Sequence, residues 1–166
     1  MIFPYLALAG QLRGGIIQSA DQYTVLFGGD TSYGESYQKL EVERGSDNII
    51  EAKGYDYPFE RLRPLLLSSD LVVINLETPI TTEEMSPFEG RKRYIHKDDY
   101  VQAAAGLKRQ NIQAVSLANN HALDYGKPGL DQTLMALSGN GIEFFGAGEN
   151  TELAGTPWSR TIRVGS

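Results

Sequence analysis

Three apolar runs in the sequence are each followed by side chains that can bind a metal or move a proton. Asp30 comes after Gly28-Gly29, Glu77 after Asn75-Leu76, and His121 after Asn119-Asn120. Carboxylates, an amide oxygen and an imidazole suit manganese, iron, zinc or magnesium ions. If the runs are neighbouring parallel strands, their carboxyl ends meet at one edge of a sheet, where ligands bind. The spacing therefore indicates a metal or catalytic site.

Each residue also has a purely structural interpretation. Asp30 after two glycines could shape a turn, and Glu77 could pair with Arg91 or Arg93. Asn119-Asn120 could be an ordinary turn, and His121 a core histidine with a satisfied hydrogen bond. The spacing alone leaves both interpretations open.

The surrounding pattern predicts an α/β fold with a parallel βαβ sheet. Nearly continuous apolar runs, typical of strands covered on both faces, lie at residues 23–27, 70–75, 114–118 and 142–145. Helical patterns lie between them at residues 59–69, 100–110 and 130–138, with Asp98 or Asp99 as the cap of the second helix. Strands that alternate with helices favour right-handed crossovers in one parallel sheet.

Two stretches lack this alternation. Residues 33–57 mix charges, glycines and aromatics, and we expect a long loop or a hairpin. Residues 78–97 contain two prolines and many charges, and we expect a long excursion over the sheet edge. His96 lies in this basic segment, and we interpret it as a surface or loop residue.

Composition narrows the classes of function. The chain has 166 residues, a net charge of −6 and no cysteine, which excludes disulfides, thiolate zinc sites and thiol catalysis. Acidity argues against nonspecific binding to nucleic acid. Residues 1–22 read as an N-terminal extension, either packed or a degenerate export segment, and there is no clear signal peptide or membrane span.

The run Ser116-Leu-Ala-Asn-Asn-His-Ala-Leu-Asp-Tyr-Gly126 resembles the signature of the CapA/PgsA family of bacterial capsule and poly-γ-glutamate synthesis proteins. Gly29-Asp30 and the run Ser69-Asp-Leu-Val-Val-Ile-Asn-Leu-Glu-Thr-Pro79 precede it in the expected order. Gly146-Ala-Gly-Glu-Asn150 follows it. The resemblance covers residues 23–157.

This family is similar to calcineurin-like metallophosphoesterases, which carry two divalent metals on an α/β sandwich. By position, the resemblance implies that Asp30, Glu77 and Asn120 are metal ligands and that Glu77 bridges the ions. It implies that His121 assists the chemistry, and Asp124 in the same turn would orient it or hold the loop. Ions of the Mn, Zn or Fe type are the implied cofactors, of unspecified identity.

The sequence departs from the phosphoesterase pattern in two ways. The early Asp-x-His becomes Asp30-Thr31-Ser32, and the later histidine ligands would lie beyond Ser166. We therefore expect residues 23–166 to be the N-terminal part of a longer domain that has little hydrolase activity alone. A further strand begins at residues 161–164, and pairing of that edge predicts self-association.

For the complete domain, the resemblance implies a divalent-metal-dependent hydrolase of the cell envelope or exterior. It would act on a γ-glutamyl amide or a phosphoester, and Arg91-Lys92-Arg93 could meet an anionic polymer such as polyglutamate or a phosphorylated substrate. The alternative is a non-catalytic accessory component of a capsule synthesis or export complex. A nucleotide-binding domain is disfavoured, because no glycine-rich phosphate loop follows the first strand.

Overall fold

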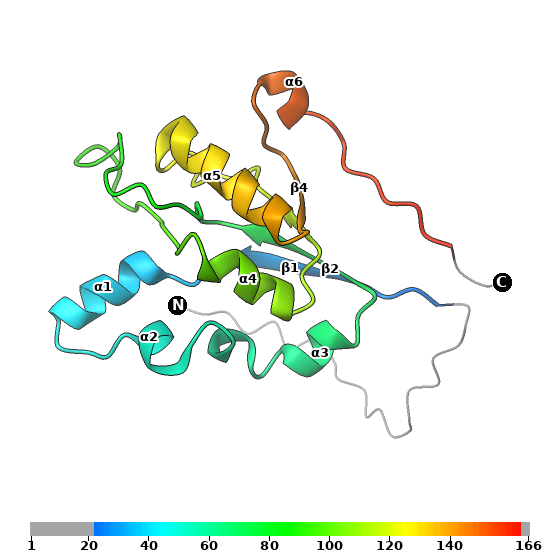
Figure 1. Ribbon diagram of the computed structural model, residues 1–166, viewed down its shortest axis with the longest axis horizontal. Coiled ribbons are helices and arrows are strands. Elements are labelled where there is room, and N and C mark those ends of the chain that lie inside the picture. The colour runs from blue at the N-terminus through cyan, green and yellow to red at the C-terminus, as the bar shows by residue number, and fades with distance from the viewer. Residues whose placement is uncertain (1–21, 164–166) are drawn as a thin grey trace.

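The sheet at the centre of the computed structural model has four parallel strands in the order β1-β2-β3-β4 (Figure 1). The strands are β1 (Val25–Thr31), β2 (Leu71–Leu76), β3 (Ala114–Ser116) and β4 (Glu143–Phe145). The structure describes residues 22–163, so nearly all of the predicted N-terminal extension lies outside it. Because all strands are parallel, their carboxyl ends share one edge. The predicted α/β fold class is confirmed.

The two neighbouring strands that carry the candidate carboxylates differ in burial. Every residue of β2 except Asn75 is buried, as predicted for a covered strand. In contrast, β1 is largely exposed, and Phe27 keeps 75% of its surface accessible. Gly28 permits the close pairing of these strands, since a Cβ there would lie 2.9 Å from Cγ2 of Ile74. β1 also runs to Thr31, so Asp30 lies within the strand rather than after it.

The main core lies between one face of the sheet and the helices α4 (Gln102–Arg109) and α5 (Gly126–Gly139). Sheet residues such as Val72, Ile74 and Val115 pack there with Leu107 and Leu137. Asp99 caps α4, because its Oδ1 accepts backbone N–H bonds from Val101 and Gln102 at 2.9 and 2.8 Å. A smaller cluster on the other face joins Leu71, Val73 and Ala114 to Tyr23, Phe145 and Trp158.

The prediction of a loop or hairpin over residues 33–57 is wrong. This stretch forms α1 (Glu35–Glu43) and α2 (Ile49–Lys53), followed by a 3₁₀ helix, η1 (Tyr57–Phe59). α1 buries no residue, so its sequence lacks the apolar stripe that predicts a helix. α2 begins at Asn48, whose side chain accepts backbone N–H bonds from its first turn.

The predicted helix over residues 59–69 is also shorter than expected. Only α3 (Arg63–Leu67) forms, because Pro64 has no N–H to donate inside a longer helix and instead stands in a first turn. Leu62 and Leu67, two apolar residues of the predicted helix, are 53% and 52% exposed. A last short helix, α6 (Thr151–Ala154), follows β4.

Residues 77–101, which we call the excursion segment, connect β2 to α4 without a regular helix or strand, as predicted for residues 78–97. A single parallel bridge joins Ile80 to Asp98, and both residues are fully buried. The segment is thus anchored at both ends while its middle passes over the carboxyl edge of the sheet. Among residues 22–163, no helix is long and apolar enough to cross a bilayer.

Candidate functional site

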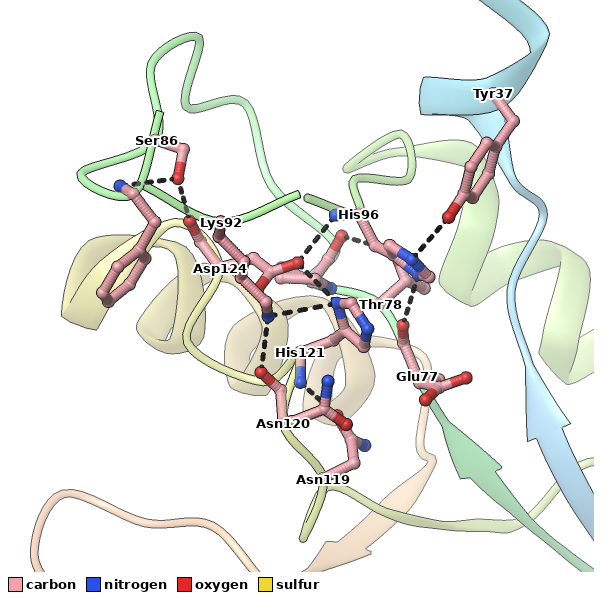
Figure 2. Close-up of polar contacts among 12 residues, drawn as sticks. Tyr37, Glu77, Thr78, Ser86, Lys92, His96, Asn119, Asn120, His121 and Asp124 are labelled. Carbon is pink, nitrogen blue, oxygen red and sulfur yellow. Dashed lines mark hydrogen bonds and ion pairs between the residues drawn. The ribbon is translucent and has the colours of Figure 1, made fainter. Parts of the chain in front are cut away.

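His121 and Asp124 form a buried pair in the turn between β3 and α5 (Figure 2). His121 Nδ1 lies 2.7 Å from Asp124 Oδ2, and the two residues are 7% and 1% exposed. Lys92 Nζ also lies 3.3 Å from His121 Nδ1, but the contact with Asp124 is the shorter one. A carboxylate oxygen can only accept, so this shorter contact favours the tautomer with the proton on Nδ1 and the lone pair on Nε2. The sequence predicted these two residues together, and the structure places them in direct contact.

The Asp124 carboxylate has further partners on the excursion segment. Lys92 Nζ donates to its Oδ1, and the backbone N–H of His96 donates to its Oδ2 at 2.7 Å. Lys92 Nζ also donates to the carbonyl oxygen of Asn120 at 2.7 Å. Because three donors, one of them the Lys92 cation, surround the carboxylate, its burial leaves no unpaired charge.

A chain of amide side chains links this pair to Asp30. The backbone N–H of His121 donates to Asn119 Oδ1 at 3.0 Å, and Asn119 Nδ2 donates to Asn75 Oδ1 at 3.1 Å. Asn75 Nδ2 donates to Asp30 Oδ1 at 2.7 Å. Sequence reasoning missed the bridging role of Asn119 and Asn75, although both stand beside residues that it selected.

The three predicted metal ligands lie at the carboxyl edge of adjacent strands. Asp30 pairs in register with Asn75, and the backbone N–H of Glu77 donates to the Thr31 carbonyl at 3.0 Å. The two acidic residues therefore lie at the carboxyl ends of adjacent strands. Asp30 and Asn120 are exposed, and Glu77 is half-buried. Among the described residues, no three His, Asp or Glu side chains gather closely enough to hold an ion. A shared ion stays a prediction.

The basic triplet 91–93 does not act as one patch. Lys92 points into the site, while the Arg91 and Arg93 guanidinium groups lie 5.9 and 5.0 Å from the ring centroids of Phe88 and Tyr94. Between α1 and the excursion segment lies a cavity of about 280 Å³, which we call the basic cavity. Its walls include Tyr37, Glu89, Lys92, Arg93 and Tyr94.

His96 is a loop residue, one of the two alternatives that we predicted, but it does not lie on the open surface. It is half-buried, and its ring stacks on the His121 ring with centroids 3.7 Å apart and planes 26° apart. Its Nδ1 lies 3.0 Å from the Glu77 carbonyl and its Nε2 lies 3.0 Å from the Tyr37 hydroxyl (Figure 2). The chain has only two histidines, and this scarcity was the one sequence signal that could have linked them.

A second, mostly apolar cavity of about 810 Å³ adjoins the site at Asn119 and Asn120. It lies between the turn after β3 and the Gly146-Ala-Gly-Glu-Asn150 stretch that follows β4. Gly146 allows these two segments to meet, since a Cβ there would lie 2.6 Å from that of Ala118. The site therefore has a mostly apolar wall here and a basic wall on the excursion segment.

Asp98 fixes the turn that follows Asp30. Its carboxylate is fully buried and accepts hydrogen bonds from the backbone N–H groups of Tyr33 and Glu35, at 2.9 and 3.3 Å, and from the Ser32 hydroxyl. Burial raises its pKa to about 7, against the lowering effect of these hydrogen bonds. Sequence reasoning considered Asp98 only as a helix cap, a role that Asp99 takes.

Three relatives whose names state a biosynthetic role align with much of this chain. It is 32% identical over 102 residues to the capsule biosynthesis protein CapA of Bacillus anthracis, covering 61% of this chain and 25% of that protein. It is 29% identical over 130 residues to the PGA biosynthesis protein CapA of Bacillus subtilis, covering 78% and 31%. A "probable polyglutamine synthesis accessory protein" of Mycobacterium tuberculosis is 32% identical over 171 residues, covering 87% and 43%. The chain thus spans less than half of each relative.

A family model matches almost all of the described residues. The model is that of the bacterial capsule synthesis protein PGA_cap, and the match runs over residues 24–166. It includes both strands that carry the carboxylates, the excursion segment and the turn that holds His121 and Asp124. The resemblance to the CapA/PgsA family is confirmed, and the chain belongs to the family of bacterial capsule synthesis proteins.

Proposed function

We propose that this chain contributes part of a divalent-metal-dependent hydrolase that acts in capsule or poly-γ-glutamate biosynthesis. The observation that carries the proposal is the buried His121–Asp124 pair at the carboxyl edge of the strands that bear Asp30 and Glu77. A positioned imidazole beside exposed carboxylates is the arrangement that acid–base chemistry near a cation requires. The relatives' printed names support the capsule-related role.

The chemistry of the donor set fits a divalent ion. Asp30 and Glu77 would offer carboxylate oxygens and Asn120 an amide oxygen, which together suit Mn²⁺, Zn²⁺ or Fe²⁺. Two carboxylates on adjacent strand ends repel one another, and a cation would offset that repulsion. When bound, such an ion would supply Lewis-acid activation of the scissile bond.

The chain's own residues would accept and then donate the proton that the hydrolysis transfers. Asp124 holds the neutral His121 ring with Nδ1–H bonded, which leaves the Nε2 lone pair free to take a proton. The protonated ring could then donate that proton to the leaving group, and Asp124 would stabilise the imidazolium. Lys92 supports this arrangement by holding the Asp124 carboxylate in place.

The substrate we propose is anionic, either a γ-glutamyl amide in polyglutamate or a phosphoester. Arg93 and Lys92 line the basic cavity next to the site, and the exposed Arg91 extends the positive surface. The mostly apolar wall would receive an uncharged part of the same substrate. We also propose that the protein acts at the cell envelope within a capsule synthesis complex, and that the chain self-associates. We do not propose that it binds nucleic acid.

One observation favours the second candidate, a non-catalytic accessory component. The name of the mycobacterial relative describes it as an accessory protein. In that case the fold would act through contacts with other capsule proteins, and the His121–Asp124 pair would serve only to stabilise the turn.

Hydrolysis assays separate the two candidates. The chain, at high concentration with Mn²⁺ or Zn²⁺, is incubated with γ-linked glutamate oligomers and with p-nitrophenyl phosphate. We expect slow, metal-dependent turnover of one substrate, because the ligand set is partial, and an about 10²- to 10⁴-fold loss in His121→Gln. No turnover at all would overturn the hydrolase in favour of the accessory role, and turnover that persists with a chelator would overturn its dependence on a metal. Lys53→Gln, an exposed residue of α2 that lies outside both cavities, is the control.

A further inference from the structure

His96 makes contacts that an ordinary loop residue would not need. It lies on the excursion segment, 25 positions from His121 in sequence, yet the two rings stack with centroids 3.7 Å apart. The nitrogen contacts reported above, to the Glu77 carbonyl and the Tyr37 hydroxyl, use both sides of its ring. Figure 2 shows the resulting row, from Tyr37 on α1 through His96 to His121 and Asp124.

These contacts fix the protonation of His96. The Glu77 carbonyl only accepts, so His96 Nδ1 must carry a proton, and Nε2 of the neutral ring accepts from the Tyr37 hydroxyl. These two contacts hold the His96 ring in one orientation, and its face is available to another aromatic ring.

We propose that His96 is a positioning residue, held by Glu77 and Tyr37, whose ring face keeps the His121 imidazole in the orientation that directs Nε2 to the substrate. Asp124 fixes only one atom of the His121 ring, which could still tilt about that hydrogen bond. A stacked neighbour opposes the tilt, because an aromatic pair gains favourable contact energy beyond the burial of its area. The role in turnover rests on the proposed hydrolase function, but the orientation of His121 does not.

The bond to the Glu77 carbonyl gives His96 a second consequence. Glu77 is one of the two strand-end carboxylates, and its backbone is tied to Thr31 beside Asp30. His96 therefore connects the backbone of the carboxylate side of the site to the face of the reacting imidazole. Displacing His96 would therefore change the distance and the angle between the Glu77 backbone and the His121 ring.

Nuclear magnetic resonance of the imidazole nitrogens tests the proposal without any substrate. The protein has only two histidines, so every imidazole signal that remains after replacing His96 belongs to His121. At fixed pH, we expect well-separated Nδ1 and Nε2 signals for His121 in the wild type. They should stay separated in His96→Phe, which keeps an aromatic face, and should converge toward an average in His96→Ala.

Separate His121 signals in His96→Ala would overturn the proposal, and so would equal convergence in His96→Phe and His96→Ala. If His96→Ala does not fold, His96→Leu fills the space without an aromatic face and should give the same convergence. Tyr37→Phe should broaden the His121 signals less than His96→Ala does. Tyr57→Phe, a hydroxyl loss on the distant η1, should leave them unchanged.

Kinetics separate this proposal from the hydrolase proposal. Where turnover is measurable, His96→Ala should lower kcat by about 10- to 100-fold with little change in KM, as for residues that orient a reacting group, and His96→Phe should recover most of that loss. An unchanged kcat in His96→Ala would overturn the catalytic part. If the protein has no turnover, the hydrolase fails while the nitrogen signals still decide whether His96 positions His121.

Discussion

The two sides of the candidate site are built in opposite ways. On the imidazole side, His121 and Asp124 are buried, and the Asp124 carboxylate accepts hydrogen bonds from Lys92 and His96 of the excursion segment. On the carboxylate side, Asp30 is exposed and Glu77 half-buried, and their positions come from backbone pairing between β1 and β2. The groups that would move a proton are thus preorganised by the protein alone, whereas the groups that would hold a cation keep oxygens free.

The largest effect should come from the imidazole side. Asp124→Asn removes the charge that Lys92, His96 and His121 share, and leaves Lys92 close to a neutral amide. We expect the free energy of unfolding to fall by about 3–5 kcal/mol, the usual cost of breaking a buried ion pair. Urea denaturation measures it.

Asp131→Asn is the matched control, because it breaks an exposed pair with Lys127 and should cost less than about 1 kcal/mol. Equal losses in the two variants would mean that the imidazole side is no better ordered than the protein surface.

The turn after Asp30 should make stability depend on pH through Asp98. Its folded pKa of about 7 exceeds the ordinary value of 3.8, so the folded state holds its proton more tightly than the unfolded state. The stabilising contribution is complete below about pH 4 and is lost as pH rises toward 7, by no more than about 4 kcal/mol.

Asp98→Asn removes the titrating group, so unfolding free energies measured between pH 4 and pH 7.5 should fall less steeply with pH than in the wild type. Asp47→Asn, on the exposed loop before α2, should leave the wild-type slope. Parallel slopes in wild type and Asp98→Asn would show that the carboxyl is ionised when folded.

Measurements of cation binding should show whether the carboxylate side of the site holds a metal ion. We expect weak binding of Mn²⁺ or Zn²⁺ in preference to Mg²⁺, and Glu77→Gln should weaken it about tenfold or more, or about 1.4 kcal/mol. Calorimetry measures the affinities, with Glu89→Gln on the exposed part of the excursion segment as control. Identical affinities in the wild type and Glu77→Gln would remove Glu77 from the ligand set.

The smallest effect should be that of the surface cations. Arg93→Gln should weaken binding of a γ-linked glutamate oligomer by about 0.2–1 kcal/mol, because its guanidinium is exposed. The loss should diminish as salt rises, which titrations at two ionic strengths would show. Lys39→Gln, an exposed cation on α1, is the comparison; an equal loss there would indicate a general charge effect rather than a basic cavity.

The sequence predicted most of the sheet and the residues at its carboxyl edge. The apolar runs predicted the four strands. The positions of polar residues after these runs identified Asp30, Glu77 and His121 as candidate site residues. It did not predict α1, because a helix that buries nothing has no apolar periodicity. Nor did it predict the contact of His96 with His121, because only the path of the excursion segment brings those two rings together.

The excursion segment also bears on the order in which the molecule folds. Its polar contacts join residues 28 to 65 positions apart, as in His96 to Asp124 and Asp98 to Tyr33. Closing such loops costs chain entropy before any contact compensates it. We therefore expect the β2–β3 sheet and its helices to form first and the site to close last. Amide hydrogen exchange should accordingly show residues 92–98 opening while β2 stays protected, so the protein can lose its site temporarily without losing its fold.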